Sequence, residues 1–279
     1  MELAPLKRGI RAMLRRFNLE IYRLDSATAV SLSRSGIEGL LRQAQSMGFV
    51  PTTVMDIGAA YGSFASQCFP VFPKARFLLV EPLVEYQPAL RKLTEAMSTA
   101  QCIMAAASAH QGEVSLNVHP DLVGSSLFRE VEKDTNVNGV LRTVCAITVD
   151  SLVKETGAKG PFLLKVDVQG AELDVLRGAE RMLADTEYIL LEVSLFKFFQ
   201  DGPDFNDVVL YMKSRGFVIY DISGLQYRPL DNALSQLDVA FVREDGLFRR
   251  RHYYATSEQR EAQNRRIRIH LEELFARTR

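Results

Sequence analysis

The sequence D-I-G-A-A-Y-G at positions 56–62 combines an acidic residue, a glycine-rich turn and the start of a helical pattern. An apolar run ends at Asp56, and Gly58 and Gly62 follow it. Glycines let the backbone approach a ligand closely, and the free N–H groups at a helix start favour an anion. The spacing G-x-x-x-G differs from the G-x-G-x-x-G of nicotinamide dinucleotide sites, which argues against a dinucleotide phosphate.

Glu81 stands at the end of the next apolar run, 25 residues after Asp56. A carboxylate at that point of an α/β sheet can accept hydrogen bonds from both hydroxyls of a ribose. The structural alternative is a surface carboxylate before Pro82, which ends the strand. The glycine turn and the carboxylate, both at strand ends, together favour a nucleoside ligand.

A third group of polar residues lies in K-V-D-V-Q-G-A-E at 165–172. Lys165 and Asp167 are two positions apart on one strand and therefore point to the same side. Charged groups between Leu and Val residues are costly in a buried strand unless they are paired or functional. Glu172 falls in the first turn of the next helix, where either its interaction with the helix dipole or a functional role explains it. Glu192, at the end of a later strand, resembles Asp167 in its setting.

These residues depend on an alternation of strands and helices for their positions. Short apolar runs, which predict strands, occur at 53–57, 76–81, 101–106, 162–167, 188–193, 217–221 and 237–242. Helical patterns occur at Ser35–Met47, from Tyr61, and at 84–97, 171–183 and 205–215. Apolar strands separated by amphipathic helices indicate an α/β fold, a doubly wound and mostly parallel sheet covered on both faces.

A β-rich insertion at 108–150 interrupts this alternation after the third strand. It contains β-rich runs at 113–118 and 142–149, with a polar loop between them that includes Ser125 and Ser126. An insertion at this point would lie over the carboxyl ends of the strands, where such folds bind ligands.

The two ends of the chain lack this alternation of strands and helices. We therefore predict three parts: an N-terminal helical extension (1–50), an α/β domain (51–245) and a basic C-terminal tail (246–279). Residues 1–23 carry six basic and two acidic side chains around an apolar helical stripe. This segment predicts a helix that packs on the domain, or one that lies on an anionic membrane surface. A polar helix is predicted from Ser257 to the end.

Composition limits the choice of function. The 279 residues include 34 basic and 34 acidic side chains, and this balance argues against general nucleic-acid binding. The three cysteines are far apart, form no C-x-x-C pair and are predicted to pack as small core residues. Cysteine usage and the lack of a signal-peptide pattern predict a cytoplasmic protein.

Five motifs in this order make the sequence resemble the FkbM family of S-adenosylmethionine-dependent methyltransferases. They are D-I-G-A-A-Y-G, V-E-P at 80–82, L-K-V-D-V-Q-G-A-E-L-D-V-L-R-G-A at 164–179, L-E-V-S at 191–194 and Q-L-D-V-A-F-V at 236–242. The resemblance covers roughly residues 50–245. It implies a class I methyltransferase fold, Rossmann-like, with seven main strands of which the last is antiparallel.

The resemblance also implies roles for individual residues around S-adenosylmethionine. The turn of Asp56, Gly58, Ala59 and Gly62 would hold the methionine portion, Glu81 the ribose, and Ala106 and Ala107 would lie near the adenine. The family turn usually reads D-x-G-A-N-x-G, and Ala60 stands where the asparagine is usual. Alanine lacks the amide hydrogen bonds of asparagine, which bears on cofactor affinity and loop geometry, but the remaining carboxylates and glycines still predict binding.

The implied reaction is O-methylation of a hydroxyl, either on a sugar, glycan or lipid-linked saccharide or on a small polyketide-type metabolite. A third interpretation, suggested by Ala60, is a catalytically idle adenosyl-binding scaffold. Methyl transfer to an alcohol needs a base. The resemblance implies that Asp167 would face both the methionine portion and the acceptor, and it is the first candidate for this base. Glu192 is the second and His119 the third. Lys165 would keep Asp167 ionised or orient the acceptor.

Residues for the acceptor are predicted as Ser125, Ser126 and Glu172. The carboxylates of Asp167, Glu172 and Glu192 could converge on a metal ion, but no histidine cluster accompanies them, so no metal site is predicted. The basic ends would bring the protein to the inner face of an anionic membrane if the acceptor is lipid-linked.

Overall fold

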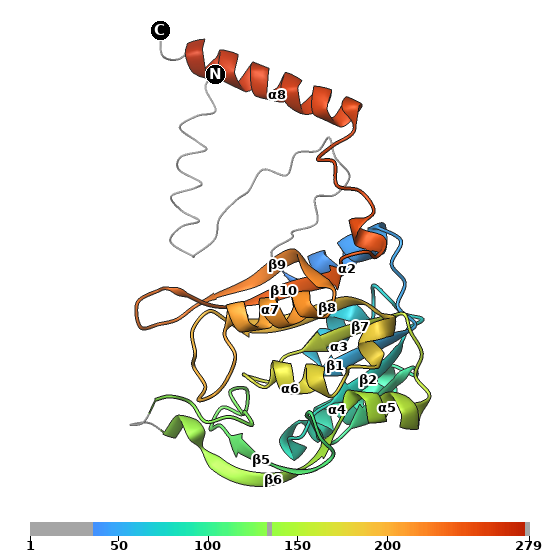
Figure 1. The fold of residues 1–279 in the computed structure, drawn as a ribbon, viewed down its shortest axis with the longest axis vertical. Helices are drawn as coiled ribbons and strands as arrows, with labels where there is room; N and C mark the ends of the chain where they lie inside the picture. The colour runs from blue at the N-terminus through green and yellow to red at the C-terminus, as the bar shows by residue number, and fades with distance from the viewer. Residues whose placement is uncertain (1–35, 133–135, 277–279) are drawn as a thin grey trace.

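A seven-stranded sheet forms the centre of the computed structural model, which describes residues 36–132 and 136–276 (Figure 1). Its strands are β1 (Thr53–Ile57), β2 (Arg76–Val80), β3 (Ala100–Ile103), β7 (Phe162–Val166), β8 (Thr186–Ser194), β9 (Phe217–Tyr227) and β10 (Leu234–Arg243). They lie side by side in the order β3-β2-β1-β7-β8-β10-β9. Six strands run in the same direction and β10 alone runs in the opposite one. This topology confirms the predicted doubly wound sheet with an antiparallel last strand.

Helices cover both faces of the sheet because successive residues of the buried strands point to opposite sides. The first face packs against α2 (Ile37–Ser46), α3 (Ser63–Cys68) and α4 (Gln87–Ala96), and the short η1 (Val84–Tyr86) precedes α4. The second packs against α5 (Val149–Thr156), α6 (Glu172–Arg177) and α7 (Phe205–Ser214). In β7, for example, Leu163 joins the first core and Leu164 the second. Both neighbours of β1 are parallel and all five of its residues are buried, as expected for a central strand.

The insertion forms a second, three-stranded sheet of β4 (Ala106–Ala107), β6 (Val140–Ile147) and β5 (Gly112–Val118), drawn in green in Figure 1. The predicted third strand, 101–106, was therefore too long, since the chain leaves the main sheet after Ile103 and pairs with β6 from Ala106. The short η2 (Asn136–Asn138) precedes β6.

Helix α5 was missed by the sequence analysis, which assigned 142–149 to a β-rich run and left the following residues unassigned. Its ends carry clear signals. The Thr148 side chain accepts a hydrogen bond from the N–H of Ser151 at 3.1 Å and caps the first turn. Gly157 ends the helix in the left-handed conformation.

The last helix, α8 (Ser257–Ala276), lies apart from the rest of the described fold (Figure 1) and has no buried residue. It follows the short η4 (Leu247–Arg249), and a further short helix, η3 (Met182–Asp185), precedes β8. Among the described residues, no helix is long and apolar enough to cross a membrane. The prediction for residues 1–23 lies outside the described part of the chain.

The cysteines correspond only in part to the prediction of three core residues. Cys68, the last residue of α3, is buried in the core, whereas Cys102 is half-buried. Cys145 is exposed on β6. The prediction for Cys145 was wrong because the insertion sheet presents one of its faces to solvent.

Candidate functional site

A cavity opens at the carboxyl ends of β1, β2 and β7. The main sheet contributes polar groups to its lining, including Gly58, Glu81, Asp167 and Gln169. The insertion contributes an apolar wall, and the lining residues from it are Leu116, Leu122, Val123, Ser125 and Leu127. The insertion therefore covers the carboxyl ends of the strands as predicted.

The glycine turn after β1 places backbone directly against the loop after β7. Gly58 has φ of +74°, and a Cβ atom built on it would lie 1.8 Å from the carbonyl oxygen of Asp167. The turn is fixed on its other side, because the N–H groups of Gly58 and Ala59 both donate to the carbonyl of Val80, at 2.9 and 3.1 Å. Glycine is thus required at position 58 by close approach as well as by conformation.

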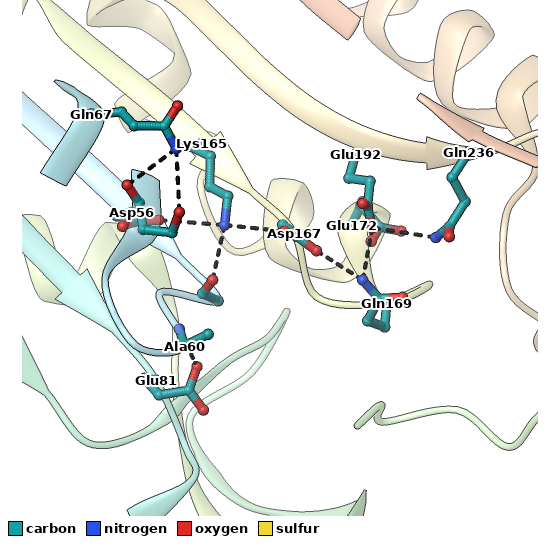
Figure 2. A network of polar contacts seen from close by, with 12 residues as sticks. Asp56, Ala60, Gln67, Glu81, Lys165, Asp167, Gln169, Glu172, Glu192 and Gln236 are labelled. Carbon is teal, nitrogen blue, oxygen red and sulfur yellow. Dashed lines mark hydrogen bonds and ion pairs between the residues drawn. The ribbon is translucent and has the colours of Figure 1, made fainter. Parts of the chain in front are cut away.

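Ala60 adopts the left-handed conformation with φ of +46°, which is unusual for a residue other than glycine or asparagine. Its N–H donates a hydrogen bond to Oε2 of Glu81 at 2.8 Å (Figure 2). The other oxygen of Glu81 accepts a hydrogen bond from the N–H of Leu83, also at 2.8 Å. Burial raises the pKa of Glu81, and these two backbone donors offset part of that effect.

Lys165 joins two carboxylates and the glycine turn (Figure 2). Its Nζ lies 3.3 Å from Oδ2 of Asp167 and 3.5 Å from Oδ1 of Asp56, and it donates to the carbonyl of Gly58 at 2.9 Å. Burial alone would lower the pKa of Lys165, but Asp167 and Asp56 raise it above its usual value. Burial raises the pKa of Asp56 to about 6, although Lys165 works against this shift. The predicted proximity of Lys165 and Asp167 is therefore observed.

Gln169 connects Asp167 to Glu192 across two strands (Figure 2). Its side-chain Nε2 donates to Oδ1 of Asp167 at 2.9 Å and to Oε2 of Glu192 at 2.7 Å. Glu192 also accepts hydrogen bonds from Gln226 at 2.9 Å and Gln236 at 3.3 Å. Burial, and then the nearby Asp167 carboxylate, raise the pKa of Glu192 to about 8.

Asp238 on β10 is the cross-strand neighbour of Glu192 on β8. Burial and then Asp167 raise its pKa to about 6. Carboxyl groups packed this closely share protons, because the ionisation of one disfavours that of the next. The arrangement can take up a proton near neutral pH, which is the property that general-base chemistry needs.

Glu172 is buried at the start of α6, where its Oε1 accepts a hydrogen bond from the N–H of Gly170 at 3.0 Å. Burial raises its pKa to about 7. It does not line the cavity. Its contacts fix the turn between β7 and α6.

The three candidates from the insertion lie at different distances from the cavity. Ser125 lines it, and its hydroxyl accepts a hydrogen bond from the N–H of His119 at 3.0 Å. Ser126 is 2% exposed, and its hydroxyl donates to the carbonyl oxygen of Gln169 at 2.5 Å. His119 does not line the cavity, and its Nδ1 lies 2.6 Å from Oδ1 of Asp121.

The cavity thus brings together some of the site residues that were predicted from the sequence. Its lining includes six of those residues, namely Gly58, Glu81, Ala106, Ala107, Ser125 and Asp167. The other eight, among them Asp56, Ala59 and Gly62, do not line it. Of these eight, Lys165 and Ser126 contact the lining directly, because Lys165 binds Gly58 and Asp167 and Ser126 binds Gln169. Sequence reasoning missed Gln169 as a site residue although it lies inside a quoted motif, and it missed Gln226, Gln236 and Asp238. No group of His, Cys, Asp and Glu side chains that could hold a metal ion occurs within residues 36–132 and 136–276.

The strand order, the glycine turn after β1 and the acidic residue after β2 define a class I methyltransferase fold. Residues 56–219, more than half of the chain, match the family model described as the methyltransferase FkbM domain. The chain belongs to this family.

Two fungal proteins are similar in sequence. Methyltransferase sdnD of Sordaria araneosa is 27% identical over 155 residues, which are 46% of this chain and 60% of that protein. Methyltransferase 1 of Beauveria bassiana (strain ARSEF 2860) is 24% identical over 183 residues, 60% of this chain and 72% of that protein.

Solved structures resemble the fold at lower identity. Methyltransferase FkbM from Methylobacillus flagellatus KT has a TM-score of 0.45 and 17% identity, over 67% of this chain and 43% of that chain. Magnesium protoporphyrin IX methyltransferase from Synechocystis PCC 6803, solved with bound SAM, has a TM-score of 0.43 and 11% identity, over 74% of this chain and 76% of that chain. The chain therefore spans less than two thirds of the length of some of these relatives.

Proposed function

We propose that this protein is an S-adenosylmethionine-dependent O-methyltransferase that transfers a methyl group to a hydroxyl of a sugar, glycan or lipid-linked saccharide. The observation that supports this most directly is the cavity at the carboxyl ends of the sheet, which joins Gly58, Glu81 and Asp167 in one lining. Family membership supports methyl transfer in general.

The residues present fit the cofactor. Because Gly58 has no side chain, its backbone is exposed to the cavity. A side chain at this position would collide with the backbone of Asp167. Each oxygen of Glu81 accepts one backbone hydrogen bond and keeps a second lone pair for a ribose hydroxyl. Apolar side chains of the insertion and of Leu83 and Tyr86 supply a surface for a planar base.

The bound cofactor would supply an activated methyl group on a sulfonium. The protein must then align the acceptor oxygen with that methyl and accept the hydroxyl proton. Asp167 lines the cavity and is the first candidate for the general base. Glu192 is linked to it through the Gln169 side chain. Lys165 holds Asp167 by an ion pair on the side away from Gln169.

A small metabolite is the second candidate for the acceptor. Val123 lines the cavity and is 61% exposed. Tyr61 is exposed after β1, and Val84 is exposed at the start of η1. Such apolar side chains fit an acceptor with an apolar part, which a polyketide-type metabolite or a lipid-linked saccharide would offer.

Calorimetric titration with S-adenosylmethionine and S-adenosylhomocysteine tests the cofactor. We expect micromolar binding to the wild type and about 10- to 100-fold weaker binding to Glu81→Ala, because the ribose loses charged acceptors. Glu38→Ala is the matched control, since Glu38 is an exposed carboxylate on α2. No binding to the wild type at millimolar ligand would refute the proposal and favour a scaffold that has lost its ligand.

Release of S-adenosylhomocysteine in the presence of hydroxyl acceptors tests the reaction. The panel contains methyl glycosides, polyprenyl-linked sugars and phenolic polyketides. We expect turnover with a saccharide and its loss in Asp167→Asn, while that variant keeps its affinity for S-adenosylhomocysteine. Turnover with the polyketides alone would favour the second candidate.

We further propose a cytoplasmic location with peripheral contact to anionic membrane through the basic ends. Arg250 and Arg251 are exposed after η4, and basic side chains near an anionic surface each add about 1 kcal/mol of attraction. Co-sedimentation with phosphatidylglycerol vesicles would compare the full chain with one lacking residues 1–23. If the two forms pellet equally with the vesicles, residues 1–23 do not contribute to membrane contact.

A further inference from the structure

The side-chain amide of Gln169 lies between the two carboxylates that are candidates for the base. One NH₂ group has two hydrogens, and here its nitrogen lies 2.9 Å from Asp167 Oδ1 and 2.7 Å from Glu192 Oε2. Each carboxylate therefore receives one N–H. Because the amide is planar, these two hydrogen bonds also fix the direction of both carboxylates relative to each other.

The backbone of Gln169 is held in a strained conformation to achieve this. Its φ is +54°, a left-handed value that is unfavourable for a residue with a side chain. Such strain persists only where surrounding contacts hold the backbone in place. One contact is the hydroxyl of Ser126, which donates to the carbonyl oxygen of Gln169 at 2.5 Å. The next residue, Gly170, packs against the ring of Phe199.

Ser126 is itself fixed by the insertion. Its N–H and carbonyl pair with the backbone of Asn117, and the side-chain amide of Asn117 also donates to the Ser126 carbonyl at 3.2 Å. Ser125 and Leu127, on either side of it, line the cavity. The wall of the proposed cofactor cavity and the support of Gln169 are thus the same stretch of chain.

We propose that Gln169 is a positioning residue that holds Asp167 and Glu192 as one proton-accepting pair, and that the insertion sets this geometry through Ser126. This inference rests on the proposed function, since it concerns the base of the methyl-transfer reaction. The pair receives the proton that leaves the acceptor hydroxyl as the new carbon–oxygen bond forms and the carbon–sulfur bond breaks.

The charged groups around the pair determine how it responds to pH. Lys165 on β7 pairs with Asp167 and with Asp56 on β1, and Asp238 on β10 neighbours Glu192. Burial and then the carboxylates of Asp167 and Asp238 raise the pKa of Glu192, whereas the Gln169 amide lowers it. Removal of the amide should therefore raise the pH at which the pair loses its last proton.

The experiment is a ¹³C NMR titration of Asp and Glu carboxyl carbons between pH 5 and 10 in the full chain. Spectra of Glu192→Gln and Asp167→Asn assign the two resonances. The Gln169→Met variant has a side chain of similar length and the same left-handed backbone at position 169, but it lacks the N–H donors. We expect the Glu192 midpoint to rise by about one pH unit in this variant. Gln101→Met, at an exposed glutamine on β3, is the control that should leave it unchanged.

Ser126→Ala provides the second variant, because it removes the tether and leaves both carboxylates and the amide present. A smaller rise of the Glu192 midpoint is expected here. It also carries the test if Gln169→Met does not fold, as judged by near-UV circular dichroism. A Glu192 midpoint equal to the wild-type value in every folded variant would overturn the inference.

Kinetics separate positioning from cofactor contact. With the methyl glycoside that the wild type methylates fastest, Gln169→Met should lower kcat about 10- to 100-fold, move the acidic limb of the pH profile upward and leave KM for S-adenosylmethionine unchanged. A raised KM with unchanged kcat would overturn the inference. Failure of the wild type to bind S-adenosylmethionine would refute the proposed function alone, because the NMR titration still reports on the bridge.

Discussion

Gly58→Ala is expected to damage both stability and the cofactor site, because the new methyl group has no room. It would lie 1.8 Å from the carbonyl oxygen of Asp167 and 3.3 Å from a methyl group of Val168. The backbone at Gly58 is fixed by its neighbours. Just before it, Asp56 of β1 pairs with Lys165 of β7 in the sheet, and the N–H of Gly58 donates to the carbonyl of Val80.

Gly157→Ala is the matched control for this substitution. Gly157 has a similar φ of +63°, compared with +74° at Gly58, but nothing lies within 4 Å of the added Cβ atom. It should lower the free energy of unfolding by about 1 kcal/mol, the cost of the left-handed conformation alone. Gly58→Ala should add about 1–3 kcal/mol for the steric conflict. The difference between the two variants measures the close approach.

Urea denaturation, thermal unfolding and calorimetric titration with S-adenosylhomocysteine provide the measurements. For a chain of this size about 1 kcal/mol corresponds to about 2 °C in Tm, so Gly58→Ala should melt roughly 4–8 °C lower than the wild type. Its affinity for S-adenosylhomocysteine should fall at least about tenfold, while that of Gly157→Ala stays unchanged. Equal losses of stability in both variants, with cofactor affinity retained, would refute the argument from close approach.

Three further substitutions test other parts of the site. Burial raises the pKa of Glu172 to about 7 in the folded state, so this carboxyl should lower wild-type stability by on the order of 3 kcal/mol as pH rises from about 4.5 through 7. In urea titrations at pH 5 and 9, Glu172→Gln should remove this share and leave the shares of Asp56, Glu192 and Asp238. An equal loss of stability between the two pH values in both proteins would contradict this. Ala60→Gly should raise the unfolding free energy by about 0.5–1 kcal/mol by relieving the left-handed conformation, with no rise in Tm as the contrary result. Lys165→Met should lower the free energy of unfolding by about 3–5 kcal/mol, because the fully buried Asp56, 0% exposed, loses its cation. A loss below about 1 kcal/mol would contradict the role assigned to this ion pair.

The parallel strands could be predicted from the sequence because each is a short, continuous apolar run, a local property. The pairing of Lys165 with Asp167 was also predictable, since residues two apart on a strand share a side. Both predictions depend on neighbours in sequence. The same reasoning placed Glu81 at a strand end, where the structure directs it into the cavity.

Partners distant in sequence could not be found in this way. Glu192 meets Gln226 and Gln236 only because β10 lies between β8 and β9 in the sheet. No local pattern encodes that order. Gln169 was missed for a different reason, since a glutamine before a glycine is an ordinary turn signal, and its function depends on two carboxylates from different strands. Helix α5 was missed because the β-rich run before it continued into its first residue.

Ala60 illustrates how structure changes the meaning of a sequence difference. The absence of an asparagine side chain raised the expectation of weaker cofactor binding or an altered loop. The structure shows that the contact from position 60 to Glu81 comes from the backbone N–H, which alanine also has. What alanine lacks is the ease with which asparagine adopts a positive φ. The difference should therefore appear mainly as a small loss of stability, and the direction of Glu81 toward the cavity should not depend on the side chain at position 60.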